Sequence, residues 1–298
     1  MNKSLSLQAA NFLFLLTMLL ILTVGSVMQY LSLSLGLIAT EVLLILLPTL
    51  IFLRLRRVPL KTGLRLNPIR PLTALACVLL GFSVSLFSLF IEAVMMQLTG
   101  MPPVPVPEGS TPSGVFPALL YFTGLAISAP ICEEIMFRGA IQGAYENRRK
   151  VSMAITVTAL MFAFYHMRLT GLLALLPVAF ILGYVAWRTQ SIYATMLVHF
   201  GMNATSAAIT LVYVLGNGMV LPLVSPWTAA AGLAATAALL WVLRRTTHLP
   251  QTTASETEPE PAGLPRPSWL AVYWPLIGAW VLYLIVAGLT LRTSPLLV

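Results

Sequence analysis

Long apolar stretches alternate with short polar or basic segments along the whole chain. About nine of these stretches approach the 20 residues that an α-helix needs to cross the hydrocarbon core of a bilayer. We expect transmembrane helices at roughly 10–31, 34–53, 71–98, 116–147, 151–168, 170–187, 191–214, 226–243 and 269–291. The fourth stretch is too long for a simple crossing, and we expect Pro130 to kink or break it. The pattern predicts an all-α fold, a polytopic transmembrane helix bundle of about eight to nine helices.

The composition agrees with a membrane protein. Of 298 residues, 58% are hydrophobic and only 9% are charged, and the mean hydropathy is +0.91. A soluble domain carries about 25% charged residues, so a soluble domain of this length is excluded. Two cysteines exclude a disulfide-stabilised secreted scaffold. The net charge of +8 comes from basic residues in loops that never form a stripe, so we expect no nucleic-acid partner.

The positions of Lys and Arg predict the orientation. If Lys3 is cytoplasmic, alternate crossings place 14 of the 17 Lys and Arg residues on the inside, and only Arg168 and Arg292 on the outside. An excess of basic residues in cytoplasmic loops is the usual signature of topology. We therefore expect an integral multi-pass protein in a lipid bilayer, the cell or inner membrane of a bacterium, with a cytoplasmic N-terminus and an external C-terminus.

Changes in composition divide the chain into five parts. Residues 1–115 hold N-terminal transmembrane helices and an external loop, and 116–214 form a transmembrane core. A further transmembrane helix lies in 215–245, and 246–268 is a polar, Pro-rich cytosolic linker. Because this linker separates 269–298 from the rest, we expect the last helix to be accessory.

Polar side chains inside the spans form three clusters. They are Glu133, Glu134 and Arg138, then His166 with the aromatic Phe162 one turn before it, then His199 and Asn203. One charge at the centre of a span costs about 2.5–3.5 kcal/mol, so such residues are candidates for function. Residues four apart share a helix face, which lets Glu134 pair with Arg138 and leaves Glu133 free for chemistry.

The helical rise places these clusters at a similar depth. Glu133, His166, His199 and Asn203 lie about 16–24 Å from basic segments at one membrane face. We expect them to converge on one layer of the bundle. Glu41, by contrast, is expected near the outer end of its span, in the membrane interface.

This set of groups suits hydrolysis of an amide. Glu133 and His166 can activate a water molecule, and His199 and Asn203 can stabilise the oxyanion of a tetrahedral intermediate. Alternatively, Glu133, His166 and His199 could bind Zn²⁺ with water as the fourth ligand, although no His-Glu-x-x-His motif occurs. The residues leave both mechanisms open, so no cofactor is certain and zinc is the one to test.

The ordered motifs Glu-Glu-x-x-x-Arg, Phe-x-x-x-His and His-x-x-x-Asn resemble the CAAX protease and bacteriocin-processing (Abi) family, which includes the type II CAAX prenyl endopeptidases. The resemblance covers roughly 116–210. It implies an intramembrane endopeptidase acting on a peptide or a prenylated protein. In the family pattern Glu133 is the general base, and Glu134 and Arg138 support the site, as does the Phe of the second motif. The two His and the Asn correspond to His166, His199 and Asn203.

Two other classes of function remain open. Buried Glu and His residues also build proton relays, so a proton-coupled transporter would use the same side chains. A scaffold or bacteriocin-immunity protein could retain the motifs to bind a partner. A transporter predicts flux without peptide cleavage, whereas a scaffold predicts that substitutions at Glu133, His166 and His199 leave the biological effect intact.

Overall fold

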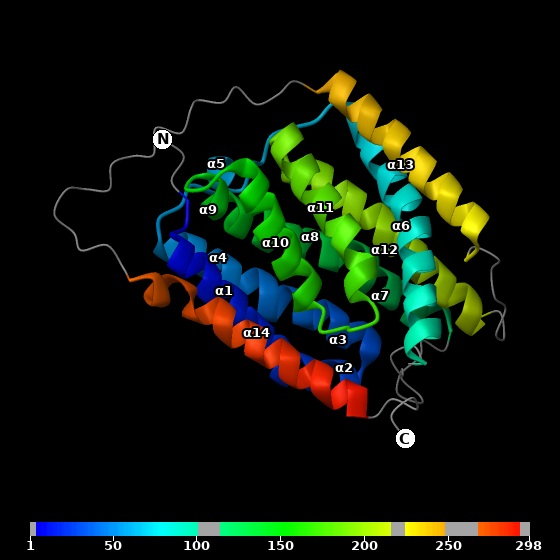
Figure 1. The fold of residues 1–298 in the computed structure, drawn as a ribbon, viewed down its shortest axis with the longest axis horizontal. Helices are drawn as coiled ribbons and strands as arrows, with labels where there is room; N and C mark the ends of the chain where they lie inside the picture. Colours follow the sequence, from blue (N-terminus) through cyan, green and yellow to red (C-terminus); the bar gives the residue numbers. More distant parts are fainter. Residues whose placement is uncertain (1–3, 101–113, 216–223, 248–267, 293–298) are drawn as a thin grey trace.

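A computed structural model describes residues 4–100, 114–215, 224–247 and 268–292, and every regular element among them is a helix (Figure 1). The first two spans and the fourth are each built from several helical segments. The segments are α1 (Leu7–Leu20), η1 (Ile21–Gly25), α2 (Ser26–Leu31), α3 (Leu33–Ala39), η2 (Thr40–Leu46), α4 (Leu47–Leu55), α7 (Val115–Phe122), η3 (Thr123–Ser128), α8 (Ala129–Glu134), η4 (Ile135–Ile141) and α9 (Gln142–Glu146). The other helices are α5 (Leu60–Gly63), α6 (Pro71–Thr99), α10 (Val151–Tyr165), α11 (Leu172–Thr189), α12 (Ile192–Leu215), α13 (Pro226–Thr246) and α14 (Trp269–Arg292).

Eight spans in the described part of the chain are long and apolar enough to cross a membrane, which confirms an all-α, multi-pass membrane protein. The ninth expected span, 151–168, is the 15-residue helix α10. At 1.5 Å per residue α10 is about 22 Å long, shorter than a bilayer core of about 30 Å. It packs against α11, and the chain turns between them at Met167–Gly171.

The five-part division of the chain stays a prediction. The external loop and most of the Pro-rich linker fall on 101–113 and 248–267, outside the described residues.

Four segments, η1 to η4, are π-helical, and two of them are explained by proline. The segments η2 and η3 each end two residues before a proline, Pro48 and Pro130. A proline ring donates no hydrogen bond and collides with the carbonyl group four residues earlier, which a wider π turn relieves. Pro130 therefore does not break the fourth span, because Ser128 and Ala129 keep right-handed helical backbone angles.

The bundle core is closed on one side by α6, which packs against both α12 and α13 (Figure 1). Two glycines let α6 and α12 approach closely. A Cβ atom added to Gly81 would lie 2.0 Å from the backbone oxygen of Val198, and one added to Gly201 would lie 2.4 Å from that of Val78. This crossing fixes the position of α12, which carries His199 and Asn203.

The last helix packs against the first. The side chain of Asn11 in α1 donates a hydrogen bond to the backbone oxygen of Val272 in α14 (2.9 Å) and accepts one from the hydroxyl of Tyr145 in α9 (2.7 Å). The α14 helix also packs Trp280 against Phe164 of α10, with the rings tilted by 52° and their centroids 4.2 Å apart. The accessory helix is thus tied to the helices that carry the motifs.

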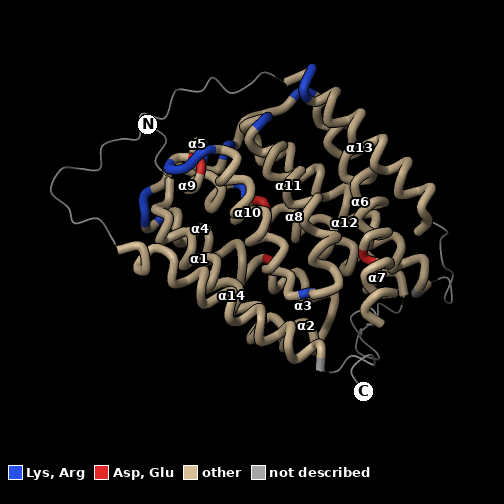
Figure 2. The backbone as a smooth tube through the Cα atoms, viewed as in Figure 1, with Lys and Arg blue, Asp and Glu red and all other residues tan. Residues whose placement is uncertain are grey.

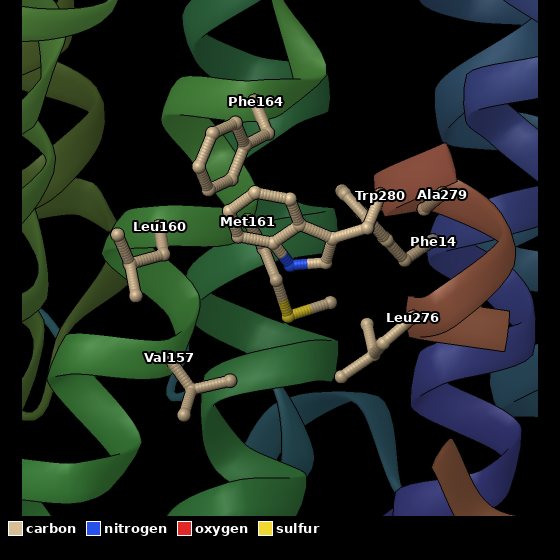
Figure 3. A pocket seen from close by; sticks show the side chains of 8 residues that line it. All are labelled: Phe14, Val157, Leu160, Met161, Phe164, Leu276, Ala279 and Trp280. Carbon is tan, nitrogen blue, oxygen red and sulfur yellow. The ribbon is translucent and has the colours of Figure 1, made fainter. Parts of the chain in front are cut away.

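An apolar cavity of about 190 Å³ lies between α1, α10 and α14 (Figure 3). Phe14, Met161, Phe164, Leu276 and Trp280 are among its lining side chains, and no acidic or histidine side chain lines it. It is an apolar space beside the motif helix α10.

The basic side chains are distributed unevenly over the bundle. Figure 2 shows Lys and Arg along the rim that carries α5, α9 and the C-terminal end of α13. At this rim Arg65 forms an ion pair with Glu146 (2.7 Å), and Arg148 donates a hydrogen bond to the backbone oxygen of Leu5 (2.8 Å). Basic residues gathered at one end of the helices agree with the predicted topology.

Candidate active site

The fourth span places two adjacent carboxylates inside the bundle. Glu133 and Glu134 end α8, where 7% and 0% of their surfaces are exposed, and the π-helical segment η4 follows them directly. Single π turns inside α-helices are frequent at functional sites, because the extra residue changes the direction of neighbouring side chains. The sequence alone did not indicate this π segment.

Glu134 is the centre of a buried ion-pair network. Its Oε1 atom accepts a hydrogen bond from the guanidinium of Arg138 (3.0 Å) and another from Nδ1 of His199 (2.9 Å). The pair with Arg138 is the one expected from the spacing of four, whereas the contact with His199 joins two spans. Arg138 also donates to the backbone oxygen of Ala179 in α11 (3.4 Å). The network therefore fixes the orientation of the His199 ring.

Glu133 faces the other side of the same imidazole ring. The Nε2 atom of His199 lies 4.0 Å from Oε2 of Glu133, and this carboxylate oxygen is buried without a hydrogen-bond partner in the protein. The two neighbouring carboxylates thus differ in environment. Oε2 of Glu134 also lacks a hydrogen-bond partner, but the charge of Glu134 is paired with Arg138, whereas Glu133 has no such guanidinium partner and keeps its Oε2 atom for another ligand.

The Phe162 ring packs at the centre of the three motifs. Its ring lies 4.4 Å below the guanidinium carbon of Arg138, and its centroid is 5.7 Å from the His199 ring and 4.8 Å from the His166 ring. A buried cation over an aromatic face is stabilised by about 2 kcal/mol. Phe162 thus packs against a charged or polar group from each motif.

The spacing in Phe-x-x-x-His has a local explanation. Because α10 ends at Tyr165, the backbone oxygen of Phe162 has no amide donor one turn later, and Nδ1 of His166 donates to it instead (2.8 Å). Met167 follows in the left-handed region (φ 51°) and turns the chain away. With Nδ1 used for capping, Nε2 is the free nitrogen of His166, and Glu133 is close enough to interact with this ring electrostatically.

Asn203 lies one turn beyond His199 on α12, as expected. Its amide nitrogen donates a hydrogen bond to the backbone oxygen of Leu125 in the π segment η3 (2.8 Å). This bond fastens α12 to the span that carries the carboxylates. One amide hydrogen remains for another acceptor, so the predicted role of Asn203 as an oxyanion donor stays a prediction.

The possible zinc ligands do not converge. No group of three or more His, Cys, Asp or Glu side chains within the described ranges is arranged to bind a metal ion. His199 directs Nδ1 to Glu134, and its Nε2 atom lies 4.0 Å from Oε2 of Glu133. As arranged here, Glu133, His166 and His199 do not fit a zinc site.

Glu41 is the residue that sequence reasoning misplaced. It does not lie in the interface: it is buried in η2, with 7% of its surface exposed, and it interacts electrostatically with Glu133. The sequence did contain the information on its depth. Glu41 precedes Arg54 by 13 residues, which is about 20 Å of helix and close to the depth of Glu133.

Comparison with known proteins identifies the region that carries the motifs. Residues 115–205 match the family model described as "Type II CAAX prenyl endopeptidase Rce1-like". No curated protein and no solved structure matches the chain. The match covers the fourth span, α10, α11 and the part of α12 that bears His199 and Asn203, and the network of Glu134, Arg138 and His199 lies within it. Residues 115–205 of this integral membrane protein therefore form an Rce1-like domain of the type II CAAX prenyl endopeptidase family, a family of peptidases.

Proposed function

We propose that the protein is an intramembrane endopeptidase in which Glu133 activates water to hydrolyse a peptide bond. The difference between the two adjacent carboxylates carries the proposal. Both residues have a buried Oε2 atom without a hydrogen-bond partner, but Oε1 of Glu134 is bound by Arg138 and His199, whereas Glu133 forms no ion pair with Arg138 and its Oε2 atom faces Nε2 of His199. A carboxylate held beside a buried imidazole, with one oxygen free, is suited to accept a proton from water.

The reaction needs one proton acceptor and groups that stabilise negative charge. Glu133 takes a proton from water as the oxygen attacks the peptide carbonyl, and it then delivers this proton to the leaving nitrogen as the C–N bond breaks. His199 is held at Nδ1 by Glu134 and directs Nε2 towards Glu133, where this nitrogen stabilises the developing oxyanion. His166 and Asn203 lie on the two neighbouring helices and supply a further nitrogen base and an amide donor.

A metal is not needed for these steps, and the donor geometry supports a metal-free mechanism. No group of three or more His, Cys, Asp or Glu side chains in the described part of the chain is arranged to hold a metal ion. We therefore propose glutamate-dependent hydrolysis, and metal analysis tests it.

The substrate we propose is a peptide with an apolar, lipid-modified end. The description of the matched family names a CAAX prenyl endopeptidase. In addition, the apolar cavity beside α10 is bounded by rings and aliphatic side chains that an isoprenoid chain could contact (Figure 3). A prenylated C-terminal peptide is therefore the first substrate to assay.

The test uses the purified full chain in lipid nanodiscs with a fluorogenic prenylated peptide. Glu133→Gln removes the base with little change in volume, so kcat should fall by about 10²–10⁴ while the thermal transition is kept. Glu146→Gln is the matched control, because Glu146 is paired with Arg65 at the basic rim of the bundle, and it should cleave like the parent protein. Full activity of Glu133→Gln would refute the assignment of the base. Ion flux without cleavage of any peptide would favour a proton-coupled transporter. If the Glu133→Gln and control variants keep the biological effect and no protein cleaves a peptide, a scaffold protein would be favoured.

A further inference from the structure

Glu41 is a third buried acidic residue beside the motifs, and it lies outside the Rce1-like domain. It lies in the π segment η2 of the second span, and η2 packs against α8, the helix that carries Glu133. Pro130 lies four residues before the end of α8, and Pro48 lies seven residues after Glu41. Both Glu133 and Glu41 therefore lie near proline-induced π turns. The two spans thus bring carboxylates from distant parts of the sequence into one layer.

The carboxylate of Glu41 has an unused oxygen. Its Oε2 atom is buried and has no hydrogen-bond partner in the protein, and the same is true of Oε2 of Glu133. The two side chains interact electrostatically, and Glu41 also interacts with Cys132 and Tyr165. A buried polar atom without a partner reduces stability by about 1–3 kcal/mol. Glu41 therefore does not stabilise the fold in the way that the pair of Glu134 and Arg138 does.

We propose that Glu41 is a further residue of the hydrolytic site and that Glu41 and Glu133 hold the attacking water molecule between them. This inference rests on the proposed function. A buried water makes about three hydrogen bonds to polar groups that lack other partners. Oε2 of Glu41 and Oε2 of Glu133 are two such atoms on different spans, and Nε2 of His199, on a third span, lies 4.0 Å from Oε2 of Glu133. Glu133 accepts the proton of this water, and Glu41 orients its lone pair towards the peptide carbonyl.

A structural role for Glu41 predicts a different response to substitution. If Glu41 only supported the bundle, its replacement would lower stability and activity together. If Glu41 holds the water, an apolar residue of similar size removes an unpaired buried polar group and leaves the fold as stable or more stable, while hydrolysis slows. Stability and turnover then change in opposite directions, which separates the two explanations.

The experiment compares Glu41→Leu and Glu41→Gln in the nanodisc assay, with Thr49→Val as the control. Thr49 is a buried polar residue of the same span whose hydroxyl donates only to the backbone oxygen of Ile45. We expect Glu41→Leu to lower kcat by about tenfold or more with little change in KM, since misplacing a reacting group by 1 Å can reduce the rate about 10²-fold. Its thermal transition should be equal to or above that of the parent. Glu41→Gln keeps a side chain that can bind water and should restore most of the lost kcat.

Three results would overturn the inference. The first is a kcat of Glu41→Leu within about twofold of that of the parent. The second is an equal loss of kcat in Glu41→Leu and Glu41→Gln. The third is a loss of stability that accompanies the loss of activity. The parent protein separates this inference from the proposed function. If the parent cleaves no peptide, the proposed function fails, whereas cleavage by both the parent and Glu41→Leu refutes only the role of Glu41.

Discussion

The buried pair of Arg138 and Glu134 gives the most quantitative prediction. Both side chains are 1% exposed or less, and the guanidinium nitrogen lies 3.0 Å from the carboxylate oxygen. Arg138→Met keeps an apolar stem of similar length but leaves the charge of Glu134 with His199 as its remaining partner. Removing one member of a buried pair costs about 3–5 kcal/mol, because the other charge stays desolvated. We expect a loss of this size in the free energy of unfolding.

The double variant separates the charge effect from packing. Arg138→Met combined with Glu134→Gln removes both charges, and a neutral buried pair of similar volume is often no less stable than the ion pair. The double variant should therefore recover about 2–3 kcal/mol of the loss seen with Arg138→Met alone, measured as a coupling free energy in a double-mutant cycle. Its kcat should remain low, because Nδ1 of His199 would lose its hydrogen bond to the Glu134 carboxylate.

The assay is reversible unfolding in mixed micelles, followed by tryptophan fluorescence, with all four proteins measured side by side. Arg168→Met is the matched control, because its ion pair with Glu92 is partly exposed. Pairs of this kind contribute at most about 1 kcal/mol. A loss below about 1 kcal/mol for Arg138→Met, or a double variant as unstable as the sum of the two single variants, would refute the reasoning.

Three further predictions concern helix packing and the metal. Gly201→Ala should prevent the close crossing of α6 and α12 and lower both stability and activity, because its Cβ would lie 2.4 Å from the backbone oxygen of Val78. Gly288→Ala is the control: its Cβ would have no atom within 4 Å, so it should behave like the parent in the same thermal and cleavage assays. Asn11→Ala removes the hydrogen bonds to Tyr145 and to the backbone of α14, so stability should fall by about 1–3 kcal/mol and hydrogen exchange of α14 should rise, with kcat unchanged; an unchanged exchange rate would contradict this docking. Protein stripped with a chelator and checked by mass spectrometry should keep its peptidase activity, and loss of activity that Zn²⁺ restores would refute the metal-free mechanism.

Much of the local structure could be predicted from the chain itself. Runs of apolar residues determine transmembrane helices because every backbone polar group must be satisfied within lipid, and this leaves few alternatives. The pairing of Glu134 with Arg138 follows from the helical period alone. The capping of Phe162 by His166 also uses a spacing of four, but it required knowing that α10 ends at Tyr165.

Contacts between helices could not be predicted in the same way. Helical rise gives the depth of a side chain, but not the direction in which its helix faces. The contact of His199 with Glu134 depends on how α12 is rotated, and that rotation is set by the glycine crossing with α6. The burial of Glu41 is the clearest case. Its depth could be calculated from the sequence, but only the packing of η2 against α8 determines that it faces Glu133 instead of lipid or water.

The sequence by itself thus determined the helices, their depth in the membrane and the three motifs, because these depend on hydrophobicity and on the period of one helix. The tertiary structure decided which carboxylate is neutralised, which remains free, and that a third acid from the second span joins them. The physical reason is that charges in a low-dielectric interior respond to neighbours from every helix around them, and these neighbours are known only once the helices are packed.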